Sequence, residues 1–154
     1  MLMWRFEAPN GSHREHIVGP IVMFLVFLPV VWWARDSMTK TRINRSLVSA
    51  AGLTLAAQTM LHIGTAMLGV SAISSGVLNL FLWGVSVSIL AAAIERRLAL
   101  AAAGFFIAFF VACAHPAWRW YAMSASNAVL MLTMAWVWGI GAVISWRSEK
   151  KVSA

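Results

Sequence analysis

The stretch Leu47–Gly69, LVSAAGLTLAAQTMLHIGTAMLG, is long and apolar enough to cross a bilayer as one helix, yet it carries several polar side chains. Thr54, Gln58, His62 and Thr65 recur at spacings of four, four and three residues. On an α-helix, this spacing places the four side chains on one stripe that is about 80° wide. Because lipid offers such groups no hydrogen bonds, we expect the stripe to face other helices, water or a ligand.

The composition of the whole chain indicates a membrane protein. Of its 154 residues, 61% are hydrophobic and only 11% are charged, and the mean hydropathy is +0.78. A soluble domain of this size would lack the polar surface it needs, so we expect residues 1–154 to form a single integral membrane domain. The net charge of +7 comes from short basic runs between apolar segments, which is typical of cytoplasmic loops, and we expect no nucleic-acid partner. Cys113 is the only cysteine, which excludes an internal disulfide.

The apolar segments predict an all-α fold, a polytopic membrane helix bundle with five transmembrane helices and short loops. The predicted spans are residues 17–34, 47–69, 77–94, 98–114 and 122–145, and residues 1–16 are expected to lie at the membrane surface. The first span is barely long enough to cross and contains Pro20 and Pro29. Four spans preceded by a surface or re-entrant N-terminal helix are therefore the alternative.

The distribution of basic residues predicts the orientation. If the loop after the first span is cytoplasmic, three basic residues lie outside, namely Arg5, Arg14 and Arg119. The other nine then lie inside: Arg35, Lys40, Arg42, Arg45, Arg96, Arg97, Arg147, Lys150 and Lys151. This excess favours an N-terminus outside and a C-terminus in the cytoplasm, and the short loops fit a bacterial inner membrane.

In this topology the polar side chains of the spans gather in the outer half of the bundle. The candidate ligand-binding residues are Gln58, His62, Thr65, Asn79, Trp83, His115 and Asn127. A histidine within an apolar span is a functional candidate, because its imidazole can bind a ligand or carry a proton. The alternative is that these positions are packing seams in which amide side chains join helices by hydrogen bonds.

No pattern in the sequence assigns a metal, a cofactor or a catalytic residue. His62 and His115 differ in depth by about a turn and a half, which disfavours a haem held between them. A zinc or copper site would need a further ligand, which His13, His16 or Glu15 could supply, although no spacing requires it. The spans have no Asp, Glu, Lys or Arg at mid-depth and no serine with an evident base, so enzymatic activity is not favoured.

Three functions stay open on these observations. The first is a ligand-binding, sensory or accessory subunit that presents the polar pocket to a small molecule or a partner helix. The second is a small carrier or channel that functions as an oligomer. The third is a histidine-dependent redox enzyme that uses haem, or a lipid-modifying enzyme. Besides membrane lipids, the partners that the apolar faces allow are further copies of the chain or a larger membrane complex.

Overall fold

The computed structural model describes residues 13–33, 35 and 41–152, without the side chains of Arg42 and of residues 138–152. These residues form five α-helices and two short 3₁₀ helices and contain no β-strand, which confirms the all-α prediction. The α-helices are α1 (His13–Trp33), α3 (Arg42–Met67), α4 (Ala72–Ala93), α5 (Ala99–Ala114) and α6 (Arg119–Val152). The 3₁₀ helices η2 (Arg96–Leu98) and η3 (Pro116–Trp118) precede α5 and α6.

Four segments of the described chain are helical, long and apolar enough to cross a membrane. They are His13–Trp33, Ile43–Met67, Ala72–Ala93 and Arg96–Ala114, with mean hydropathies of 2.0, 1.3, 1.9 and 2.1. The chain is therefore a helix bundle of the membrane class. The predicted fifth span, residues 122–145, falls within α6, and its crossing of the membrane stays a prediction.

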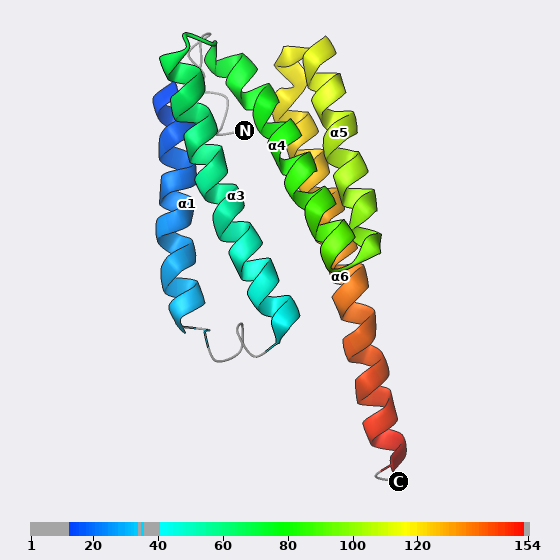
Figure 1. Ribbon diagram of the computed structural model, residues 1–154. Coiled ribbons are helices and arrows are strands. Elements are labelled where there is room, and N and C mark those ends of the chain that lie inside the picture. Colours follow the sequence, from blue (N-terminus) through cyan, green and yellow to red (C-terminus); the bar gives the residue numbers. More distant parts are fainter. Residues whose placement is uncertain (1–12, 34, 36–40, 153–154) are drawn as a thin grey trace, which may run out of the picture.

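The first helix extends further toward the N-terminus than the sequence suggested. Residues 13–16, predicted here as the end of a surface segment, form the first turn of α1, and residues 1–12 lie outside the described residues. α1 continues through Pro20 and Pro29 and lies along α3 (Figure 1). Its 21 residues span about 31 Å at 1.5 Å per residue, close to the thickness of a bilayer's hydrocarbon core. This arrangement favours a full crossing over the surface or re-entrant alternative.

Local hydrogen bonds set where α3 and α4 begin. The hydroxyl oxygens of Thr41 and Ser71 accept hydrogen bonds from the backbone N–H groups of Asn44 and Ser74, both at 3.1 Å. Such N-caps satisfy amide groups that the first helical turn leaves unpaired. The cap at Ser71 starts α4 at Ala72. Residues 70–76, which lie between two of the predicted spans, are therefore mostly helical, and the turn before them is tight. Gly69, with a φ of +68°, makes that turn.

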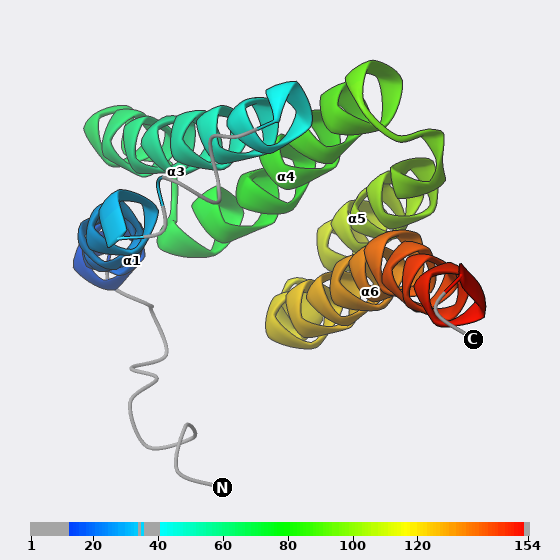
Figure 2. The same cartoon turned by 90° about the horizontal axis from the view of Figure 1, so that it is seen from below.

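α4 lies in the centre of the bundle, between the α1–α3 hairpin and the α5–α6 pair (Figure 2). Its core contacts are with α5 and α6, where Leu80, Phe105 and Ala101 are fully buried. Small residues allow the close approach: a Cβ atom added at Gly84 would lie 3.0 Å from the ring of Phe106. α3 packs on the other side of α4, and α1 packs mainly on α3.

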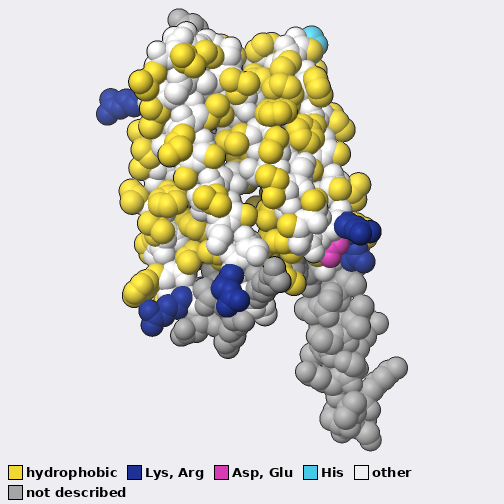
Figure 3. Space-filling model, in the orientation of Figure 1, with side chains coloured by type: hydrophobic (Ala, Val, Ile, Leu, Met, Phe, Trp, Pro, Cys, Tyr) yellow, Lys and Arg dark blue, Asp and Glu magenta, His cyan; other side chains and the backbone are white. Residues whose placement is uncertain are grey.

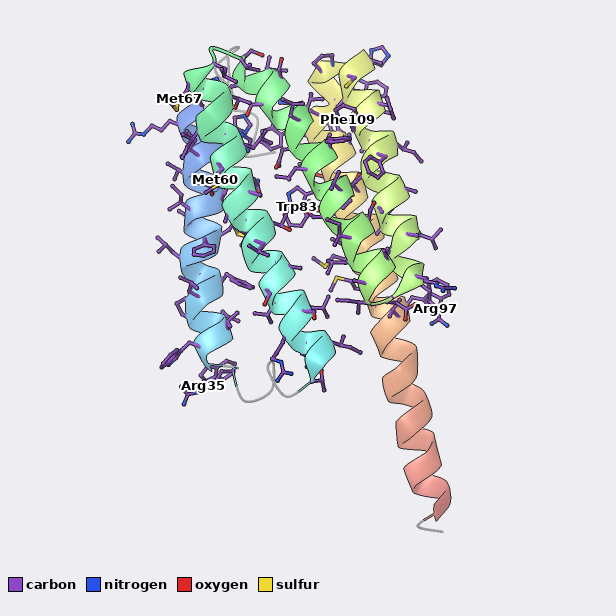
Figure 4. The ribbon with its side chains drawn as sticks, viewed as in Figure 1. Arg35, Met60, Met67, Trp83, Arg97 and Phe109 are labelled. Carbon is purple, nitrogen blue, oxygen red and sulfur yellow. The ribbon has the colours of Figure 1, made fainter. Side chains whose placement is uncertain are left out.

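The surface has the distribution expected of a membrane bundle. Hydrophobic side chains cover the visible face, and most of the visible Lys and Arg side chains lie near its lower end (Figure 3). Arg35 and Arg97 both lie toward this end, whereas Met67 lies at the opposite end (Figure 4). The turn at Gly69 and the cap at Ser71 therefore lie at the end away from these two arginines.

Candidate functional site

A cavity of about 430 Å³ lies between the α1–α3 hairpin and helices α4 and α6. Five of the seven predicted site residues line it, namely Gln58, His62, Asn79, Trp83 and Asn127. The remainder of its wall consists of Glu15, His16, Gly19, Pro20, Met23, Ala51, Leu55, Gly76, Arg119, Trp120 and Met123. The polar stripes of three predicted spans thus meet at one mainly apolar cavity, and its volume is typical of sites for small molecules. Whether these residues bind a ligand stays a prediction.

Thr65 lies behind the cavity wall rather than in it. Its hydroxyl lies 2.7 Å from the Oγ atom of Ser75, and the same Oγ atom lies 2.6 Å from Nδ1 of His62. His62 is 1% exposed and Ser75 is fully buried. The three side chains therefore form a buried hydrogen-bonded chain between α3 and α4 that fixes the orientation of the His62 ring.

His115 does not take part in this cavity. It lies at the C-terminal end of α5, is exposed, and has its ring centroid 5.6 Å from that of Trp118. α5 packs against the side of α4 and α6 that is turned away from the α1–α3 hairpin (Figure 2). The sequence placed His115 at a suitable depth, but depth alone does not decide toward which neighbours a helix end turns.

His16 joins the site from α1. Its ring centroid lies 5.2 Å from that of His62, and 5.9 Å from that of Trp120 with the two planes 5° apart. The stacked pair of His16 and Trp120 bridges α1 and α6 at one edge of the cavity. Sequence reasoning considered His16 only as a further metal ligand, because it assigned the residue to a surface segment. The signal in the sequence that could have indicated its role was its spacing of three residues from His13, because both histidines belong to the first turn of α1.

Trp83 forms an aromatic part of the wall. Its side chain lies between α3 and α4 (Figure 4), and its ring stacks on that of Phe105 at 6.1 Å with an interplanar angle of 19°. Phe105 is fully buried in the core, so Trp83 is held against a rigid neighbour. A flat apolar surface of this kind suits a ring or a chain of a ligand.

Asn79 is the most unusual polar group of the site. Its side chain is 5% exposed, and its Oδ1 atom is buried without a hydrogen-bond partner among the described residues. A buried amide oxygen in this condition costs free energy, commonly about 1–3 kcal/mol. Because Asn79 lines the cavity, a bound molecule is a partner that could remove this cost.

The described residues contain no cluster of three or more His, Cys, Asp or Glu side chains arranged to hold a metal ion. His16 and His62 supply two imidazoles, and the nearest further candidates do not converge on them.

Comparison of the chain with protein-family models, with curated proteins and with solved structures finds no match, so the geometry of the cavity is the basis on which its function is argued.

Proposed function

We propose that this protein is a non-enzymatic membrane protein that binds a small, mainly apolar molecule in the cavity between α1, α3, α4 and α6. It would serve as a ligand-binding, sensory or accessory subunit. The observation that carries the proposal is the buried Oδ1 atom of Asn79, which has no partner among the described residues, in a residue that lines a cavity large enough for a ligand.

The position of the cavity supports an opening in the outer half of the bundle. His62 lies five residues before Met67, the last residue of α3, which is roughly 8 Å along the axis. Arg35 and Arg97 lie toward the other end (Figure 4). Under the positive-inside rule, that other end faces the cytoplasm and the cavity lies nearer the outer surface of what we propose is a bacterial inner membrane.

A cavity-filling substitution tests the proposal. Ala51 lines the cavity from α3, so a phenylalanine in its place occupies the space that a ligand would need. Ala128 is exposed on α6 and does not line the cavity, so Ala128→Phe is the matched control. The wild-type protein and both variants are purified in mild detergent, and bound molecules are identified by native mass spectrometry.

We expect a small molecule to accompany the wild-type protein and the Ala128→Phe variant, and to be lost from Ala51→Phe. Retention of the same molecule by Ala51→Phe would place its binding elsewhere and overturn the proposal. If the wild-type protein binds neither a molecule from the cells nor an added probe, the polar stripes are packing seams between helices.

A further inference from the structure

The hydrogen-bonded chain behind the cavity fixes which nitrogen of His62 carries a proton. The Thr65 hydroxyl donates to the backbone oxygens of Leu61, at 2.8 Å, and of His62, at 3.1 Å. With that proton directed at the carbonyl oxygens, Ser75 is assigned as the donor in the 2.7 Å contact with Thr65. The proton of Ser75 is used in turn, so the 2.6 Å contact with His62 requires a proton on Nδ1.

His62 is consequently a neutral imidazole whose Nε2 atom is an acceptor. The ring is 1% exposed and no carboxylate of the described residues is hydrogen-bonded to it, so a second proton would create a buried charge without compensation. Nε2 has no hydrogen-bond partner among the described residues, and His62 lines the cavity. The chain through Ser75 thus presents a lone pair on the ring to whatever occupies the cavity.

A second acceptor belongs to Asn79, which also lines the cavity. Its buried Oδ1 atom has no partner in the described part of the chain. Two acceptors without donors, on adjacent helices α3 and α4, call for a ligand that supplies a hydrogen-bond donor.

The charges of the wall limit the ligand further. Glu15 and Arg119 are the acidic and basic residues among those that line the cavity, so their formal charges cancel. The remaining wall is largely aliphatic and aromatic, with Met23, Leu55 and Trp83 as examples. An uncharged molecule avoids the cost of placing a net charge in such surroundings.

We infer that the cavity binds an uncharged apolar molecule through a hydroxyl group that donates a hydrogen bond to Nε2 of His62 or to Oδ1 of Asn79. This inference rests on the proposed function and adds the chemical class of its ligand. The hydroxyl can belong to a phenol or to an aliphatic alcohol, and both supply the same donor on an apolar body.

Two pairs of probes that differ only in the donor test the inference. Decylphenol is compared with decylanisole, and decanol with methyl decyl ether, in equilibrium binding to the purified protein. Each ether keeps the apolar body and loses the O–H group. We expect the hydroxyl compound of at least one pair to bind about tenfold more tightly than its ether, the value of one good hydrogen bond. Preference within the phenol pair alone indicates an aromatic ligand, whereas preference within the alcohol pair indicates an aliphatic one.

Two variants connect this preference to the residues. In Asn79→Leu one acceptor is lost, and in Ser75→Ala the His62 ring is no longer held with its proton on Nδ1. We expect the ratio of ether to hydroxyl dissociation constants to fall at least threefold in one of them, since the number of available acceptors falls. Ser75 does not line the cavity, so a merely structural effect of its loss would weaken both probes equally and leave the ratio unchanged. Thr59→Val, which removes a hydroxyl outside the cavity, is the matched control.

The outcomes separate this inference from the proposed function. If both members of each pair bind equally well and Ala51→Phe abolishes their binding, the cavity is a ligand site but the donor inference is wrong. If no probe binds and no molecule accompanies the purified wild-type protein, or if binding persists in Ala51→Phe, the proposed function itself is wrong. The comparison within the wild-type protein decides the donor inference even when a variant fails to fold.

Discussion

The Nδ1 atom of His62 on α3 lies 2.6 Å from the Oγ atom of Ser75 on α4. This short contact joins α3 and α4, two consecutive helices that are connected by one tight turn. Both side chains are buried. The contact holds the ring in place at the wall of the cavity. The same hydrogen bond therefore contributes both to the packing of α3 on α4 and to the orientation of a candidate site residue.

Ser75→Ala should lower the free energy of unfolding by about 1–3 kcal/mol, because it leaves the N–H group of His62 buried without an acceptor. Reversible unfolding in mixed detergent micelles, followed by circular dichroism, measures the change. Ser74→Ala is the control: Ser74 is exposed, and its hydroxyl contacts that of Ser71 at 2.9 Å, so a change below about 0.5 kcal/mol is expected. Equal stability of the Ser75→Ala and wild-type proteins would contradict the role of the buried chain.

Asn79→Leu should have the opposite effect on the ligand-free protein and raise the free energy of unfolding by about 1 kcal/mol. The reason is that leucine has a similar volume and removes a buried polar atom that has no partner in the described residues. Thermal unfolding of delipidated protein measures the gain, and Asn127→Leu is the comparison because Asn127 is exposed. A loss of stability in Asn79→Leu would mean that the amide already has a partner in the folded protein.

Gly84→Leu should separate α4 from α5. A Cβ atom at this position already lies 3.0 Å from the Phe106 ring, and a larger side chain forces the helices apart, at a cost of roughly 1–3 kcal/mol. At Gly64 an added Cβ atom meets nothing within 4 Å, so Gly64→Leu should be tolerated. Comparison of the two variants by detergent unfolding tests the close approach, and equal tolerance would show that the two helices are not in tight contact at Gly84.

The orientation can be tested with single cysteines in a Cys113→Ala background. Ala117 in η3 and Arg96 in η2 are both exposed and belong to opposite ends of α5. With the proposed topology, a membrane-impermeant thiol reagent should label Ala117→Cys in intact cells and label Arg96→Cys only after the membrane is permeabilised. The reverse pattern would invert the topology and place the cavity in the cytoplasmic half.

The sequence by itself determined the class of the fold and the content of its helices. Apolar runs of bilayer length and the residues that end them are local properties, so the presence of helices over residues 47–67, 77–93 and 99–114 could be read directly. The periodic stripe of Gln58 and His62 likewise predicted which face of α3 turns inward, because helical periodicity needs no knowledge of other helices. Helix starts were less accurate, since single caps such as Ser71 extend a helix beyond its apolar run.

Only the tertiary structure decided which side chains meet. His16 stacks on Trp120 and lies beside His62, and Ser75 fixes the ring of His62, whereas His115 turns away on α5. Depth in the membrane follows from the position in the chain, but the rotation of each helix and the choice of its neighbours do not. These depend on contacts between residues far apart in sequence, such as Gly84 with Phe106, where the lack of a side chain at the glycine lets the two helices pack closely. The sequence therefore contained the components of the site, and packing between helices decided which of them form one cavity.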